Sequence, residues 1–147
     1  MKSLRMVLIG FLAVLVLIQF VPVSRTNPPV ESEIAAPQNV ESILSRSCYN
    51  CHSNKTVWPW YSYVAPVSWL VSSDVSGGRQ KLNFTTWDRY APDKQSKLLS
   101  EIWKEVQGGD MPPWYYTIKH SEGRLSDADK TVLHDWSQSP PQPGPDK

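Results

Sequence analysis

The stretch LLSEIWKEVQGG, residues 98–109, decides the fold class of this chain. Its large apolar residues recur at spacings of three and four, which places them on one side of an α-helix. Gly108–Gly109 follows the last of them and is typical of a helix end. We therefore expect a helix that faces a core with Leu98, Leu99, Ile102, Trp103 and Val106.

The same pattern occurs in three other segments, each with recognisable ends. Asn39 is a suitable residue to cap a helix that runs into residues 48–51. Pro66 can open a second helix, which we expect Gly77–Gly78 to end. The residues Ser126–Asp129 have the spacing of a capping box. The first helix would carry Val40, Ile43 and Leu44 on one face, the second would run through Trp69, Leu70 and Val75, and the last would bear Val132, Leu133 and Trp136.

Composition bounds both the fold and the partners. No segment shows the sustained alternation of a β-strand, so we expect an all-α fold. A length of 147 residues fits one main domain, and 40% hydrophobic residues with seven tryptophans exclude a disordered chain. Lys and Arg number 15 against 14 for Asp and Glu, which leaves a net charge of +1. Nucleic-acid binding usually needs a clustered basic face, so we expect no nucleic-acid partner.

The N-terminus indicates export. Lys2 and Arg5 precede an apolar run from Met6 to Val23. As a helix this run would span about 27 Å, close to the hydrocarbon thickness of about 30 Å. We expect residues 1–24 to be an uncleaved membrane anchor, with a cleaved signal sequence as the alternative. The two basic residues keep the N-terminus cytoplasmic, so the rest of the chain lies on the periplasmic or extracellular side of the inner or cytoplasmic membrane.

Proline-rich segments flank the main domain. Residues 25–38 are predicted to be an extended linker that holds the domain off the membrane. Residues 138–147 carry several prolines without large apolar residues and are predicted to be a tail. The main domain is therefore expected at residues 39–137.

Cys48-Tyr49-Asn50-Cys51-His52 is a Cys-x-x-Cys-His motif, the attachment signature of c-type haem. Cysteines three apart on a helical turn can each form a thioether to one haem vinyl group, while the adjacent histidine reaches the iron. Three other interpretations remain. They are a thioredoxin-like redox pair, a zinc site with distant histidines, and a structural disulfide across a very short loop.

The iron's second axial position needs its own candidate. Met111 is the one methionine outside the N-terminal segment, and it lies between two glycines and two prolines in GGDMPP, residues 108–113. Such a stiff loop after a helix can present a thioether to haem, although methionine also fills gaps in cores. His120 and His134 are the alternatives. We expect His120 to be solvated and His134 to lie at or near the surface.

The chain also resembles a known family in several segments. They are CYNCHSN (48–54), WPWYS (58–62), APVSW (65–69), Gly78–Arg79, LNF (82–84), GDMPP (109–113) and Leu125–Ser126. Together they resemble the bacterial haem-binding domain family of small exported cytochrome-c-like proteins. The resemblance implies a cytochrome-c-like helical domain that binds one haem c covalently at Cys48 and Cys51, with His52 on the iron.

The expected function is that of a membrane-tethered monohaem cytochrome that transfers single electrons to redox partner proteins. With His52 and Met111 both on the iron, the site would pass electrons rather than bind oxygen. A haem-based sensor or a weak peroxidase with a labile distal ligand is the alternative. The carboxylates and serines form no recognisable catalytic arrangement, so we expect no enzyme.

Overall fold

The computed structural model describes residues 2–139. Within this range the chain forms seven α-helices and no β-strand, which confirms the all-α fold. The α-helices are α1 (Lys2–Leu17), α2 (Gln38–Ser47), α3 (Tyr49–His52), α4 (Val67–Lys81), α5 (Pro92–Gly108), α6 (Trp114–Lys119) and α7 (Asp127–Ser137). Short 3-10 helices lie between them: η1 (Ile18–Phe20), η2 (Trp60–Tyr63), η3 (Trp87–Arg89) and η4 (Ser121–Gly123).

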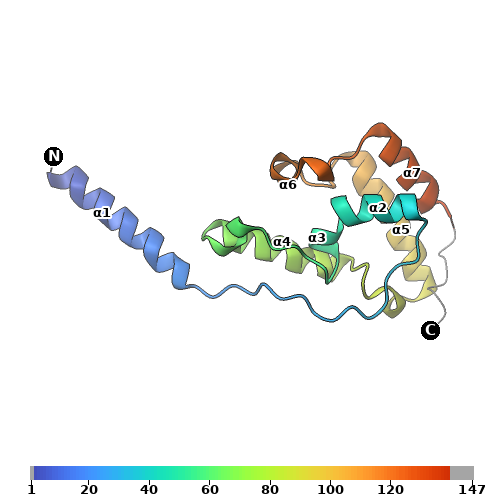
Figure 1. Ribbon diagram of the computed structural model, residues 1–147, viewed down its shortest axis with the longest axis horizontal. Helices are drawn as coiled ribbons and strands as arrows, with labels where there is room; N and C mark the ends of the chain where they lie inside the picture. Colours follow the sequence, from blue (N-terminus) through green and yellow to red (C-terminus); the bar gives the residue numbers. More distant parts are fainter. Residues whose placement is uncertain (1, 140–147) are drawn as a thin grey trace.

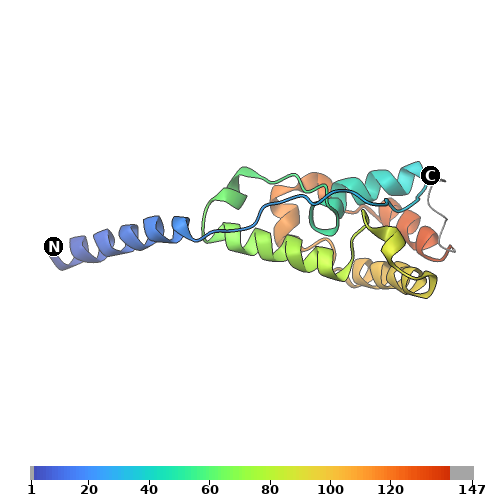
Figure 2. The same ribbon diagram turned by 90° about the horizontal axis from the view of Figure 1, so that it is seen from below.

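The helix α1 extends away from the rest of the molecule (Figures 1 and 2). Together with η1 it forms an apolar segment, Lys2–Phe20, with a mean hydropathy of 2.3 and no buried residues. It is the one helix in residues 2–139 that is long and apolar enough to cross a membrane, and a signal sequence would have the same properties. An N-terminal apolar helix is thus present, as predicted.

The hydrophobic core lies where α2, α5 and α7 meet. The helix α7 packs against both α2 and α5, and α3 joins this group to α4. Burying each large apolar side chain contributes about 1.5–3 kcal/mol to folding, so the predicted faces of α2, α5 and α7 stabilise the fold. The buried members are Val40, Ile43 and Leu44 on α2, Leu98, Leu99, Ile102 and Val106 on α5, and Leu133 and Trp136 on α7. Ile34, Tyr49, Leu82, Phe84 and Trp87 complete this core. On α4 only Val75 of the predicted apolar residues is buried, whereas Trp69 and Leu70 are exposed.

Local signals at the helix ends are partly confirmed. Gly109 follows α5 in the left-handed region, with φ of 79°, where a side chain would be strained. Ser126 and Asp129 form the predicted capping box of α7. Pro66 stands directly before α4, as predicted. The prediction for Asn39 was wrong, because α2 begins at Gln38, so Asn39 lies inside its first turn.

The prediction that Gly77–Gly78 ends the second helix was also wrong. The helix α4 continues through both glycines to Lys81. A Cβ atom on Gly78 would lie 2.6 Å from the carbonyl oxygen of Cys51. Gly78 therefore serves the close approach of α4 to α3 rather than a helix end, while nothing lies within 4 Å of the same atom on Gly77.

Residues 25–37 are extended and lie along the domain, and Gln38 already belongs to α2. The backbone N–H of Glu31 donates to the carbonyl of Thr85 at 3.0 Å, and that of Ile34 donates to the carbonyl of Phe84 at 2.9 Å. Ile34 is buried in the core cluster. This segment is therefore a strap on the domain surface. Of the predicted tail, only residues 138–139 lie within the described range, and the limits of the domain stay a prediction.

Arg79 on α4 fixes the start of this strap. Its guanidinium donates to the carbonyl of Thr26 and to Oδ1 of Asn27, both at 2.8 Å. It also donates to the carbonyl of Ser53 at 2.7 Å and to Oγ1 of Thr56 at 2.8 Å. Because a guanidinium offers five donors in one plane, a single side chain can join the strap, α4 and the loop after α3.

Candidate functional site

The two cysteines lie at a break between helices. Cys48 separates α2 from α3 with φ of −124° and ψ of −37°, and its carbonyl accepts from the N–H groups of Cys51 at 3.1 Å and of His52 at 2.9 Å. This single turn of helix brings Cys51 and His52 back toward Cys48. Both thiols are free and half-buried.

The high pKa values of the two thiols argue against a thioredoxin-like redox pair. Burial, with a smaller contribution from Cys51, raises the pKa of Cys48 to about 12. Burial, with a smaller contribution from Asp74, raises the pKa of Cys51 to about 11. Both groups are therefore neutral thiols at pH 7, whereas redox-active pairs such as thioredoxin depend on a lowered pKa. Among residues 2–139, no cluster of three or more His, Cys, Asp or Glu could hold a metal ion.

His52 is fixed by two backbone carbonyls. Its Nδ1 lies 3.1 Å from the carbonyl oxygen of Gly78 and 3.1 Å from that of Leu82. Because carbonyl oxygens only accept, Nδ1 carries the proton and Nε2 keeps its lone pair. Burial lowers the pKa of His52, so the imidazole is neutral at pH 7. A neutral ring with one nitrogen held by a second group is the state in which histidine binds metal ions.

This arrangement depends on the absence of a side chain at Gly78. The carbonyl oxygen of Cys51 lies where its Cβ would be, so α4 comes close enough for the Gly78 carbonyl to reach His52. The sequence contains only one signal for this contact, the glycine itself. Its partner was not predictable from the chain alone.

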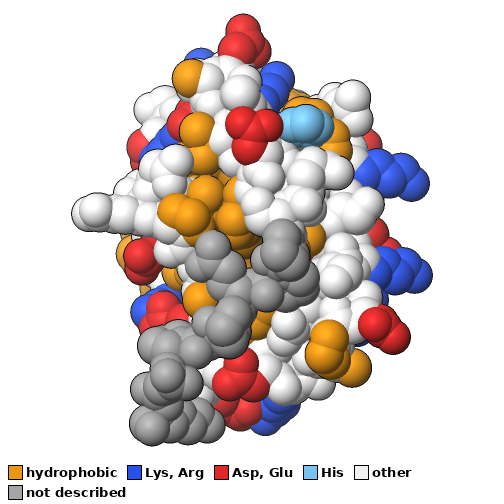
Figure 3. Space-filling view, turned by 90° about the vertical axis from the view of Figure 1, so that its right-hand side faces the viewer, with side chains coloured by type: hydrophobic (Ala, Val, Ile, Leu, Met, Phe, Trp, Pro, Cys, Tyr) orange, Lys and Arg blue, Asp and Glu red, His pale blue; other side chains and the backbone are white. Residues whose placement is uncertain are grey.

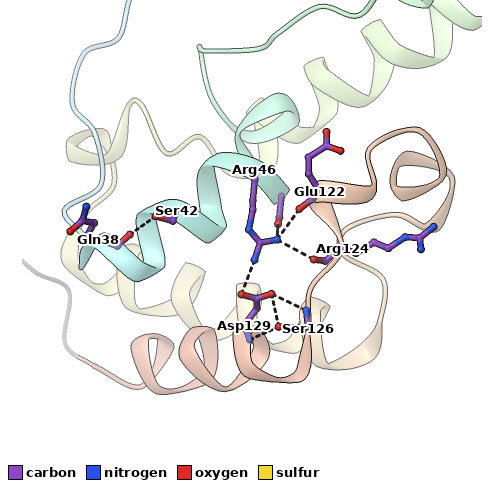
Figure 4. A network of polar contacts seen from close by, with 8 residues as sticks. Gln38, Ser42, Arg46, Glu122, Arg124, Ser126 and Asp129 are labelled. Carbon is purple, nitrogen blue, oxygen red and sulfur yellow. Dashed lines mark hydrogen bonds and ion pairs between the residues drawn. The ribbon is translucent and has the colours of Figure 1, made fainter.

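Arg46 holds the end of α2 directly before the motif (Figure 4). Its Nη1 donates to the carbonyls of Glu122 at 2.9 Å and of Arg124 at 3.0 Å. Its Nη2 lies 2.7 Å from Oδ1 of Asp129, whose Oδ2 accepts from Ser126 in the capping box. The start of α7 and the turn before it are thereby joined to the helix that precedes Cys48. The sequence analysis did not single out Arg46.

His120 belongs to an aromatic cluster rather than to the solvent. Its Nε2 lies 2.7 Å from the hydroxyl of Tyr61, and its Nδ1 lies 3.1 Å from Oε1 of Glu122. Its ring stacks on Tyr116 at 4.4 Å between centroids, and the Tyr116 hydroxyl accepts from Nδ2 of Asn50 inside the motif at 2.9 Å. The expectation of a solvated His120 was wrong. Because both ring nitrogens have partners here, neither is free to bind iron.

The comparison with protein families decides what this site belongs to. The family model described as a haem-binding domain matches residues 13–139. This chain belongs to the haem-binding domain family. No curated protein and no solved structure matches it. Haem is therefore the cofactor against which the residues around Cys48–His52 have to be tested.

The residues beside the motif fit a flat apolar cofactor such as haem. Leu70, Asp74 and Gly78 follow one another at four-residue spacing, so they share one face of α4, and this face meets Cys51 at Gly78. The hydroxyl of Tyr115 on α6 donates to Oδ2 of Asp74 at 3.3 Å, which brings α6 to the same face. Large apolar side chains are exposed on both helices: Val67 and Leu70 on α4, and Trp114, Tyr115 and Ile118 on α6.

A pocket among the described residues lies elsewhere. It has a volume of about 330 Å³ and is lined by Thr26, Trp58, Ser72, Arg79 and others. Helical periodicity places Ser72 on the side of α4 opposite Asp74. None of the motif residues lines this pocket, so it is not where a haem-binding domain with this motif would hold its cofactor.

Met111 lies in the loop between α5 and α6, where the sequence analysis expected it. Its backbone N–H and that of Asp110 both donate to the carbonyl of Glu105, at 3.2 and 3.0 Å, and its side chain is half-buried. These bonds fix the loop to α5 without defining where the sulfur points, so the distal role of Met111 stays a prediction. His134 is exposed on α7, with its ring 4.7 Å from that of Trp103.

Proposed function

We propose that this haem-binding domain is a c-type cytochrome that carries one covalent haem and passes single electrons to redox partner proteins. Cys48 and Cys51 would hold the haem through thioethers, with His52 and Met111 as the axial ligands. Haem supplies the one-electron iron couple, and the protein supplies ligands, burial and access for partners.

The geometry of His52 carries this proposal. A proximal ligand needs Nε2 deprotonated and the ring held in place, and the two carbonyls at 3.1 Å from Nδ1 do both. The ring is next to Cys51 in the chain and half-buried.

The free state of both cysteines is compatible with covalent attachment. A thioether forms when the S–H group adds across a vinyl double bond, so sulfur joins one carbon and the proton joins the other. This addition is balanced without an oxidant. The two S–H groups that the addition consumes are available, because Cys48 and Cys51 are free thiols.

The N-terminal helix supports a membrane tether. Residues Lys2–Phe20 have the length and hydropathy of one membrane span. Lys2 and Arg5 favour a cytoplasmic N-terminus, which puts the haem domain on the periplasmic or extracellular side of the inner or cytoplasmic membrane. Covalent attachment would prevent loss of haem outside the cytoplasm.

Optical spectra test the proposal. The full chain is expressed with cytochrome maturation factors and measured in its oxidised, reduced and carbon-monoxide-treated forms. A c-type reduced spectrum that carbon monoxide leaves unchanged is the expected result. A spectrum that shifts with carbon monoxide would instead support a haem-based sensor or a weak peroxidase with a labile distal ligand.

A double variant, Cys48→Ser with Cys51→Ser, is the matched control for attachment. After denaturation and acid–acetone extraction, haem should stay with the wild-type protein and leave the variant. Haem that can be extracted from the wild type would contradict thioether attachment while leaving haem binding intact.

A further inference from the structure

An exposed aromatic patch lies outside the haem site. Trp60 and Tyr63 in η2 are 77% and 60% exposed, and Val64 directly after them is also exposed. Trp60 packs edge-on against Tyr61, which itself turns inward to His120. Tyr61 thus belongs to the aromatic cluster of the site, while Trp60 and Tyr63 of the same short helix are exposed.

This patch adjoins the end of the N-terminal helix. The side chain of Gln19 forms a reciprocal pair of hydrogen bonds with the backbone of Ala65, at 2.9 Å to its N–H and 3.2 Å to its carbonyl. Arg25 donates to the carbonyl of Ser62 at 3.2 Å and lies 4.5 Å from the ring centroid of Tyr63. Figures 1 and 2 both show the end of α1 beside the start of α4.

The length of the N-terminal helix places its end at the membrane surface. The 16 residues of α1 and the 3 of η1 would together span about 30 Å, at about 1.5 and 2.0 Å per residue, which equals the thickness of a hydrocarbon core. Gln19 is then at the outer edge of this core. Ala65, which is hydrogen-bonded to Gln19, lies at the same depth. Val64 of the aromatic patch directly precedes Ala65 in the chain.

We propose that Trp60, Tyr63 and Val64 lie in the outer interface of the lipid bilayer and hold the haem domain against the membrane with η2 facing the lipid. This inference rests on the membrane tether of the proposed function. Tryptophan and tyrosine are enriched at this depth because their rings are apolar and their N–H and O–H groups reach water or headgroups. Arg25 beside Tyr63 adds a cation that suits anionic lipid headgroups.

The opposite end of the domain has a different surface. Figure 3 shows acidic and basic side chains interspersed around the rim of the end of the molecule away from α1, with hydrophobic side chains at its centre. The charged rim suits a face in water. With η2 on the lipid, the end that contains α5 and α7 points into the aqueous compartment, where soluble redox proteins can reach it.

Spin labelling of the full chain tests the orientation. Trp60→Cys and Val64→Cys variants, matured with haem on Cys48 and Cys51, are labelled with a nitroxide and reconstituted in phosphatidylcholine–phosphatidylglycerol vesicles. Lys97→Cys on α5, 68% exposed at its side chain, is the matched control. The parent chain is labelled in parallel to measure any reaction at the motif cysteines.

The expected result is a several-fold lower collision rate with a water-soluble nickel complex at positions 60 and 64 than at 97, with a higher collision rate with oxygen. Equal nickel accessibility at all three positions, in a chain that stays in the membrane after an alkaline carbonate wash, overturns the proposal while the tether stands. Release of the chain by that wash refutes the tether itself, and with it the interface. A reduced c-type spectrum for each variant shows that the domain is folded.

Discussion

Replacing Gly78 by alanine should destabilise the domain, although alanine is the better helix former. The added Cβ would lie 2.6 Å from the carbonyl oxygen of Cys51 and 3.2 Å from its Cβ. The first distance is about 0.8 Å short of the 3.4 Å at which ordinary contact begins. The helix α4 must therefore move away from α3, because the obstructing atom is backbone and cannot rotate aside.

The magnitude follows from three contributions. Forcing an extra methyl group into a packed contact costs about 1–3 kcal/mol. The same movement stretches the 3.1 Å contact between the Gly78 carbonyl and Nδ1 of His52, a bond that contributes about 0.5–1.5 kcal/mol. The gain in helix propensity from glycine to alanine is at most about 1 kcal/mol. We expect a net loss of about 1–3 kcal/mol.

Gly77→Ala is the matched control, because it adds the same atom to the same helix one residue earlier. Nothing lies within 4 Å of its Cβ, so this variant should gain up to about 1 kcal/mol. Urea unfolding of both variants, followed by far-ultraviolet circular dichroism, gives the two midpoints. Coincident midpoints, or a more stable Gly78→Ala, would refute the close approach of α4 to the motif.

Three other perturbations test separate parts of the molecule. Met111→Ala should keep the covalent haem but lower the reduction potential and allow carbon monoxide to bind. Redox titration measures the potential, and optical spectra show carbon monoxide binding. An unchanged potential would exclude Met111 as a ligand. Arg79→Lys keeps the charge but loses the planar set of donors to Asn27 and its neighbours. Limited proteolysis should therefore cut residues 25–38 faster in this variant than in the wild type. Equal cleavage rates would contradict the role of Arg79 in the strap. Burial tends to raise the pKa of Asp129, but hydrogen bonds from Arg46 and Ser126 outweigh it and hold this pKa below its ordinary value of 3.8. The stability from Asp129 is therefore fully present above that value and is lost as pH falls through the lower folded-state pKa. The difference in urea midpoint between wild type and Asp129→Asn should shrink on acidification below about pH 4, and a difference that stays constant would contradict the assignment.

The parts of the fold that depend on neighbouring residues were predictable from the sequence. The apolar faces of α5 and α7 repeat within one helix, so their periodicity identified the core positions that the structure buries. The turn at Gly109 and the capping box at Ser126 are also determined within four residues.

The glycine pair at 77–78 shows where this local reasoning fails. Two glycines permit a helix end, but they equally permit another backbone to come close. Cys51, which decides between these, lies 27 positions before Gly78 in the chain and in a different helix. The same holds for His120, whose polar sequence neighbours suggest solvent while its partner Tyr61 is 59 residues away.

The candidate site also has a part that was predictable from the sequence and a part that was not. The spacing of Cys48, Cys51 and His52 is local and was readable, because one helical turn fixes it. The carbonyls that orient His52 belong to Gly78 and Leu82, and every residue has a carbonyl. No sequence pattern marks which ones will be used, so the support of the site became visible only in the fold.

The hydrogen bonds of Arg46 join segments that are far apart in the chain and are therefore synthesised at different times. The carbonyls that receive its guanidinium lie 76 and 78 residues later in the chain. In the proposed export from the N-terminus, Cys48 and Cys51 therefore emerge well before the residues that immobilise the preceding helix. Under the proposed covalent attachment, haem would be added while the two thiols are still accessible, and α7 would pack onto α2 afterwards.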